Sequence, residues 1–146
     1  MGLDMHLEKK AYVGANWPHN NVKGKIELTR GKEDRPIKIN LNKVVSIIED
    51  VAYWRKANQI HKFFVDNVQD GEDDCKEYYV PIETLEELVN LCKQVLETKN
   101  TELLPTGSGF FFGSTDYDIY YFEQLRDTIE MLDGLEEGDY YYSSSW

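Results

Sequence analysis

The stretch TLEELVNLCKQVLET, from Thr84 to Thr98, has the most regular helical pattern in this chain. The apolar residues that recur there every three or four positions are Leu85, Leu88, Val89, Cys92, Val95 and Leu96. This spacing puts them on one face of an α-helix. Thr84 and Glu87 have the spacing of a capping box, so we expect the helix to begin at Thr84. A helix with one apolar face must bury that face against a second layer.

Shorter stretches elsewhere in the chain predict the strands of such a layer. Between residues 5 and 13, apolar and more polar residues alternate, which predicts a first strand. Residues 22–31 and 35–41 predict two more strands, and the three together would form an antiparallel meander. Residues 14–21 are rich in Gly, Pro and Asn and predict a loop. Residues 77–81 predict another short strand.

Residues 40–52 fit two kinds of secondary structure. Their apolar positions match a helical face with Asn40 as its N-cap. The many β-branched residues between Val44 and Val51 also suit a strand. We favour the helix, and we expect residues 53–68 to continue it.

The remaining elements complete an α+β pattern. A final helix is predicted from Asp118 to Leu132, with Ile119 on its core-facing side. We therefore expect a small antiparallel sheet, built from the N-terminal meander plus short strands, packed against three or so helices. Residues 1–138 are predicted to form a single α+β domain. Residues 139–146 form an aromatic C-terminal tail that is expected to be either an ordered arm or a flexible end.

Charge is distributed unevenly along the 146 residues, whose net charge is −11. Residues 1–62 carry 12 Lys and Arg against 7 Asp and Glu, whereas residues 63–146 carry 4 against 20. The acidic part is expected to attract cationic partners and to repel nucleic acid. No apolar run approaches the roughly 20 residues that span a bilayer, and the first ten residues lack a signal-peptide core. We therefore expect a cytoplasmic protein that does not enter a membrane.

The stretch GSGFFFGSTDYD, residues 107–118, is the best candidate for a contact surface. Phe110–Phe112 predicts a short strand between turns, and three successive aromatic side chains in a strand cannot all face one core. The glycine spacing is not that of a phosphate-binding loop. The candidate binding residues here are Phe111, Ser114, Thr115, Asp116, Tyr117 and Asp118.

A second group of candidates lies between residues 53 and 61. Trp54, Arg55, Asn58 and His61 are the candidate ligand-binding residues, since Arg and Asn suit carboxylates and planar polar groups. His61 is also the candidate catalytic base, although a lone helical histidine is more often structural.

An acidic loop follows this second group. Residues 66–77 match a calcium loop at four positions, but Val68 and Asp73 do not fit it and no second helix follows. The sequence implies no cofactor strongly, but a divalent cation could bind to this loop. Its candidate ligands are Asp66, Asp70, Asp73 and Asp74.

Three blocks taken together resemble a family of small proteins encoded by phages and prophages. They are MGLDM (Met1–Met5), VAYWRKANQIHKFFVDNVQDGEDDC (Val51–Cys75) and LLPTGSGFFFGSTDYDIYYF (Leu103–Phe122). The resemblance implies an accessory protein in the cytoplasm of a bacterial host, without assigned catalytic residues. It also implies a protein that interferes with host machinery, including defence systems.

Three classes of function follow from these observations. The first is a binding protein, monomeric or homodimeric, whose partner is a host protein or a small nucleotide-like ligand. The second is a small metal-dependent hydrolase that uses His61 with nearby carboxylates. The third is a structural component of a virion, although the chain has no coiled-coil or repeat pattern. We expect binding rather than catalysis.

Overall fold

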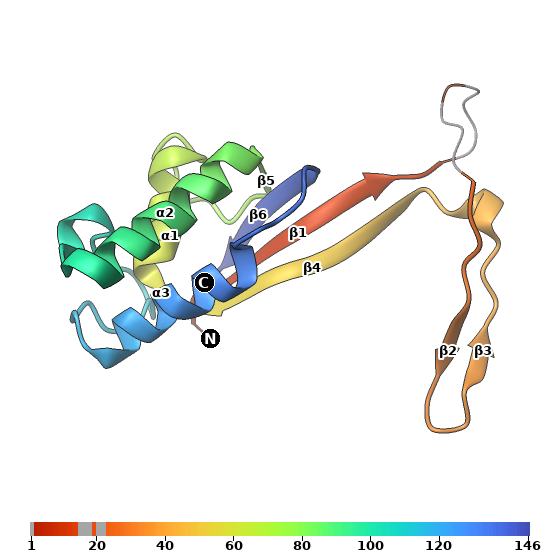
Figure 1. Ribbon diagram of the computed structural model, residues 1–146, viewed down its shortest axis with the longest axis horizontal. Helices are drawn as coiled ribbons and strands as arrows, with labels where there is room; N and C mark the ends of the chain where they lie inside the picture. The colour runs from red at the N-terminus through yellow and green to blue at the C-terminus, as the bar shows by residue number, and fades with distance from the viewer. Residues whose placement is uncertain (1, 15–18, 20–22) are drawn as a thin grey trace. The chain divides into compact units, whose positions relative to one another are not determined.

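The computed structural model describes residues 2–14, 19 and 23–146 (Figure 1). The chain divides into two compact units where the sequence suggested one domain over residues 1–138. The first unit, here called the acidic unit, comprises residues up to Lys9 together with Glu49–Trp146. The second, here called the hairpin unit, comprises Lys10–Ile48. Most of the loop predicted over residues 14–21 lies outside the described residues.

Four strands form an antiparallel sheet in the order β4-β1-β6-β5. These strands are β1 (Asp4–Tyr12), β4 (Ser46–Arg55), β5 (Tyr78–Val80) and β6 (Asp139–Ser145). Strands β1 and β4 each contribute residues to both units. Side chains alternate between a buried face and an open face, as the two-residue period of a strand requires. The expected strands near residues 5–13 and 77–81 are confirmed.

Three helices lie together beside the sheet in the acidic unit (Figure 1). They are α1 (Asn58–Asn67), α2 (Ile82–Thr98) and α3 (Ile119–Leu132). Their apolar faces and the buried face of the sheet form one core, which confirms the α+β fold. Among the described residues, no helix combines the length and the apolar composition that a membrane span requires.

Helix α2 begins earlier than its sequence predicted. It starts at Ile82 with Pro81 as N-cap, and no side chain caps it, so the capping box of Thr84 and Glu87 is wrong. The backbone explains the difference, because Pro81 has an extended ψ of 146° and its carbonyl accepts the Thr84 amide at 3.0 Å. The helix ends at Lys99, whose left-handed φ of 59° lets its amide bond to the Val95 carbonyl.

The helix favoured over residues 40–52 is wrong. Only a short 3₁₀ turn, η1 (Leu41–Lys43), occurs there, and β4 follows it. The β-branched residues of this stretch lie in or beside β4, which pairs with β1 in the sheet. Just outside the two strands, the Val13 amide donates to the Val45 carbonyl at 2.8 Å. Because β4 continues to Arg55, the helix predicted over residues 53–68 is shortened to α1.

The N-terminal meander is also wrong, since β1 pairs with β4 and β6 instead. Strands β2 (Leu28–Arg30) and β3 (Arg35–Ile37) form a separate two-stranded antiparallel sheet in the hairpin unit. The turn between them contains Gly31 at φ 79°, a conformation that favours glycine. Every residue of both strands is exposed.

The C-terminal residues are ordered as strand β6, which lies between β1 and β5 in the sheet. Tyr140 and Tyr142 point into the core, and they pair with Val80 and Tyr78 of β5. The stretch DYYYSSS alternates buried and more exposed side chains along its whole length. Residues 139–145 therefore belong to the fold and do not form a flexible tail.

Candidate functional site

The loop of residues 105–118 forms a turn where a strand over Phe110–Phe112 was expected. The Phe112 amide bonds to the Gly109 carbonyl at 3.3 Å, and Phe111 has a left-handed φ of 58°. This turn buries the Phe112 side chain, while Phe110 and Phe111 are 66% and 50% exposed. The strand prediction is therefore wrong, and Phe111 lies on the surface as its candidate contact role requires.

Asn58, at the start of α1, holds this loop in place. Its side-chain amide donates to the carbonyls of Ser114, at 2.8 Å, and Phe112, at 3.2 Å. Its side-chain oxygen accepts the Gly107 amide at 3.1 Å. Asn58 is only 1% exposed, and its side chain forms three hydrogen bonds with groups inside the protein. The predicted ligand-binding role of Asn58 is therefore replaced by a structural one.

Hydrogen bonds connect Thr106, near the start of the loop, to Thr115 and Tyr117, near its end. The Thr106 hydroxyl donates to the Thr115 carbonyl at 2.9 Å, and the Thr106 amide donates to the Tyr117 hydroxyl at 3.3 Å. The Asp116 amide donates to the Ser114 hydroxyl at 3.0 Å. These contacts give the polar residues of the loop a defined arrangement, which lowers the entropy that binding would cost.

Asp118 is the N-cap of α3, one residue before the helix begins at Ile119. Its carboxylate accepts the amides of Tyr120, at 3.1 Å, and Tyr121, at 3.2 Å. The Tyr121 hydroxyl donates to the Leu104 carbonyl at 2.7 Å, and burial raises the pKa of this phenol. The start of α3 is thus fixed both by its cap and by a buried tyrosine.

Replacing Asp118 by alanine is expected to lower the free energy of unfolding by about 1 kcal/mol, because two amide donors lose their acceptor. Asp118→Asn keeps an acceptor in the same place and is expected to cost much less. Urea denaturation followed by circular dichroism measures both variants. Equal losses for the two substitutions would show that the cap contributes through its charge rather than through its hydrogen bonds.

Two adjoining hollows, here called the Tyr120 surface, lie where β4, the loop and α3 meet. Their volumes are about 510 and 240 Å³, and they share Tyr120 and Gln124. The charged residues that line them are Arg55, Lys56, Asp116, Asp118, Glu123, Asp127 and Glu130. Five carboxylates therefore outnumber two cations on this surface.

The Tyr120 surface gathers several of the predicted site residues. Trp54 and Arg55 line the larger hollow, and Ser114, Asp116 and Asp118 line the smaller one. Trp54 itself is almost fully buried, and its indole N–H donates to the Thr128 hydroxyl at 2.9 Å. It supports the floor of the hollow rather than its rim.

The sequence missed the contribution of α3 to this surface. Tyr120, Glu123, Asp127 and Glu130 recur at helical spacing, a signal that is equally typical of any solvated helix face. Tyr120 is 69% exposed. Ile119, which was predicted to face the core, is 65% exposed because it is the first residue of the helix.

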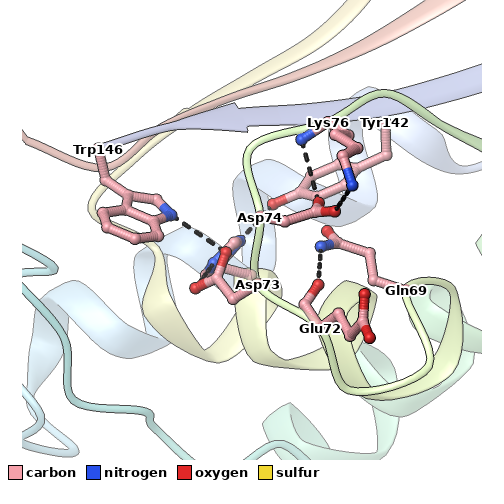
Figure 2. A network of polar contacts seen from close by, with 8 residues as sticks. Gln69, Glu72, Asp73, Asp74, Lys76, Tyr142 and Trp146 are labelled. Atoms are coloured by element: carbon pink, nitrogen blue, oxygen red, sulfur yellow. Dashed lines mark hydrogen bonds and ion pairs between the residues drawn. The ribbon is translucent and has the colours of Figure 1, made fainter.

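His61 does not lie on the Tyr120 surface. It is 2% exposed, with Nε2 at 2.9 Å from an Asp73 carboxylate oxygen and Nδ1 at 2.7 Å from the Tyr142 hydroxyl. Burial, followed by the charge of Asp73, raises the pKa of Tyr142, so its hydroxyl stays protonated beside Nδ1. The other Asp73 oxygen accepts the Trp146 indole N–H at 3.0 Å (Figure 2). This network joins α1 to β6 and leaves His61 no exposed nitrogen for catalysis.

Three of the four candidate metal ligands are paired with separate partners. Asp66 pairs with Lys62 at 2.8 Å. Asp74 pairs with Lys76 at 2.7 Å, as Figure 2 shows. The hydrogen bond from Lys76 lowers the pKa of the Asp74 carboxyl. Asp73 is bonded to His61, and Asp70 is exposed in a turn. Within the described part of the chain, no three His, Cys, Asp or Glu side chains form a group that could hold a metal ion.

The two cysteines supply no reactive centre that the site uses. Burial raises the pKa of Cys92 to about 12, so this residue remains an apolar thiol in the core. Cys75 is exposed on the acidic loop, outside both hollows of the Tyr120 surface. The best-formed site of the acidic unit is therefore the Tyr120 surface. Comparison of the chain with models of protein families, with curated proteins and with solved structures finds no match.

Proposed function

We propose that this chain is an accessory binding protein of the kind that phages and prophages encode. In this proposal it acts in the cytoplasm of a bacterial host and interferes with host machinery, such as a defence system, by binding a host protein. The observation that carries the proposal is the Tyr120 surface, where the exposed side chains of Tyr53 and Tyr120 lie among carboxylates. The three sequence blocks that resemble phage and prophage proteins supply the host context.

The chemistry of the surface favours a cationic protein partner. Tyrosine is enriched among the residues that contribute most to protein interfaces, and Tyr120 lies at the centre of this surface. Ile119 and Tyr117 add exposed apolar area beside it in sequence. The excess of carboxylates speeds the approach of a partner with a basic patch and disfavours an acidic one.

A nucleotide-like ligand is supported less well. The cationic and amide groups proposed to hold phosphates were Arg55, Lys56 and Asn58. The Asn58 amide is already bonded to the loop, and the two cations share the surface with five carboxylates that would repel phosphate. The enclosed His61 likewise favours binding over a hydrolase.

Site-specific photocrosslinking tests the proposal. A photoreactive phenylalanine analogue at position 120 is expected to form an adduct of one defined mass with a host protein in cells. The matched control carries the analogue at Gln94, an exposed residue of α2 that lines neither hollow. The same adduct at both positions, or at neither, would refute a specific partner at the Tyr120 surface.

With the partner purified, Tyr120→Ala is expected to weaken binding by about 10-fold or more, the usual effect of removing a central interface tyrosine. Raising the salt concentration is expected to slow association, because charge steers a basic partner towards this surface. Gln94→Ala is expected to leave both quantities unchanged. Isothermal titration calorimetry and stopped-flow association measure them. Unchanged affinity in Tyr120→Ala would exclude this surface.

A further inference from the structure

The hairpin unit has no hydrophobic core of its own. No apolar side chain among its described residues is buried. Its exposed large apolar residues are Tyr12, Leu28, Ile37, Ile39, Val45, Ile47 and Ile48. A two-stranded hairpin is marginally stable alone in water, and exposed apolar side chains gathered in one unit mark a surface that a partner covers.

The two units carry opposite charge. Residues 10–48 contain 8 Lys and Arg against 3 Asp and Glu, a net charge of +5. The remaining residues contain 8 against 24, a net charge of −16. Within the hairpin unit, Glu27 pairs with Lys25 at 2.6 Å and Glu33 pairs with Arg35 at 2.7 Å. Two of its three acidic residues are thus neutralised locally, and exposed cations such as Lys32 and Lys38 remain.

The acidic unit has a groove in which carboxylates surround a few partly exposed apolar side chains, here called the Ile82 groove. It consists of two hollows, of about 320 and 480 Å³, that share Ile82. The apolar residues that line it are Tyr79, Ile82, Leu85, Val89, Leu132 and Leu135. The charged residues that line it are Glu83, Glu86, Asp133, Glu137 and Asp139. None of its described lining residues is Lys or Arg, although Asp133 is paired with Lys93 at 3.0 Å.

We propose that the Ile82 groove of one copy binds the hairpin unit of a second copy, and that the exchange is reciprocal. In this dimer the apolar side chains of the hairpin unit pack against Tyr79, Ile82 and Leu135, which are the apolar lining residues of the groove that are not buried. Lys32 and Lys38 complement the carboxylates of the groove. Reciprocal exchange closes a two-fold dimer, which leaves no unpaired hairpin and no unpaired groove.

The chemistry of the hairpin favours this occupant over nucleic acid. Phosphates would engage its cations, but they offer nothing to side chains such as Ile37 and Ile39. The net charge of −11 also opposes the approach of a polyanion to the protein. The proposed dimer goes beyond the interaction with a host protein and uses a different surface. The Ile82 groove and the Tyr120 surface share no lining residue.

Sedimentation velocity of the full chain over a range of concentrations tests the proposal. We expect a concentration-dependent dimer whose dissociation constant increases about 10-fold or more when salt is raised from 50 to 500 mM. The double substitutions Lys32→Glu/Lys38→Glu and Glu83→Lys/Glu137→Lys are each expected to weaken it by about 10-fold or more. Mixing the two variants is expected to restore association, because both exchanged contacts of the mixed dimer then pair opposite charges.

The matched control is Glu97→Lys/Glu102→Lys, which reverses two exposed charges outside the groove and is expected to leave the dimer unchanged. Circular dichroism checks that every variant folds, and the salt series on the unmodified chain remains decisive if one does not. A monomer at all concentrations, or a mixture that does not associate, would overturn the proposal. Retardation of a short DNA duplex by the monomeric protein, lost in Lys32→Glu/Lys38→Glu, would assign the hairpin to nucleic acid instead.

Discussion

Replacing Tyr142 by alanine is expected to lower the free energy of unfolding by about 3–5 kcal/mol, the usual cost of removing a large buried ring. Tyr142 is fully buried in β6, and its ring stacks on Phe64 of α1 with centroids 4.0 Å apart. The substitution leaves a cavity between the sheet and α1. It also removes the hydroxyl that satisfies Nδ1 of the buried His61.

Tyr142→Phe separates the two effects, because it keeps the ring and deletes only the hydroxyl. We expect it to cost about 1–3 kcal/mol, since the buried His61 nitrogen is left without a partner. Tyr79→Ala, on the exposed face of β5, is the matched control and is expected to cost much less. Urea denaturation followed by tryptophan fluorescence measures all three variants. A loss below 1 kcal/mol for Tyr142→Ala would contradict the placement of the C-terminal residues in the core.

Asn58→Ala is expected to cost about 2–4 kcal/mol of unfolding free energy and to release the loop of residues 105–118. The substitution removes every side-chain partner that Asn58 supplies to Gly107, Phe112 and Ser114. Buried polar groups that lose their partners carry most of this cost. The Gly107 amide is therefore expected to exchange its hydrogen faster, and the Tyr120 surface loses its fixed shape.

Asn67→Ala provides the control for this substitution. Asn67 is an exposed residue of the same helix, and its side chain donates one partly buried hydrogen bond to the Phe63 carbonyl at 2.8 Å. We expect Asn67→Ala to cost about 1 kcal/mol, the usual contribution of a single hydrogen bond. Hydrogen exchange measured by mass spectrometry on both variants reports the loop directly. Equal exchange of the Gly107 amide in the two variants would show that other contacts hold the loop.

The elements that could be predicted from the sequence are those whose packing follows one period. Helix α2 and helix α3 each have a continuous apolar stripe, and β1 has a clear alternation. Residues 40–52 satisfied two periods at once, and the ladder with β1 decided between them. The local pattern does not show which distant segment a strand pairs with. For this reason the helix was favoured over the strand that became β4.

The candidate site could be predicted only in part, for a similar reason. Of the predicted binding residues, Arg55, Ser114, Asp116 and Asp118 do line the Tyr120 surface. Phe111, Thr115 and Tyr117, which were predicted from the same loop, line neither of its hollows. Asn58 and His61 were chosen for their polar character, but the structure uses that character inside the protein. A polar side chain can face a ligand or bond to groups inside the protein. Tertiary contacts decide between the two, and the spacing of residues in the sequence does not reveal those contacts.

The position of β6 has a consequence for the order in which the sheet can form. This strand follows β1 and β5 in sequence, yet it separates them in the sheet. Until β6 is in place, β5 has no neighbouring strand and the core lacks Tyr140 and Tyr142. The sheet of the acidic unit therefore closes through a pairing between segments that are more than 100 residues apart, from Asp4–Tyr12 to Asp139–Ser145. Such long-range pairings form slowly, so we expect β6 to join the sheet late in folding.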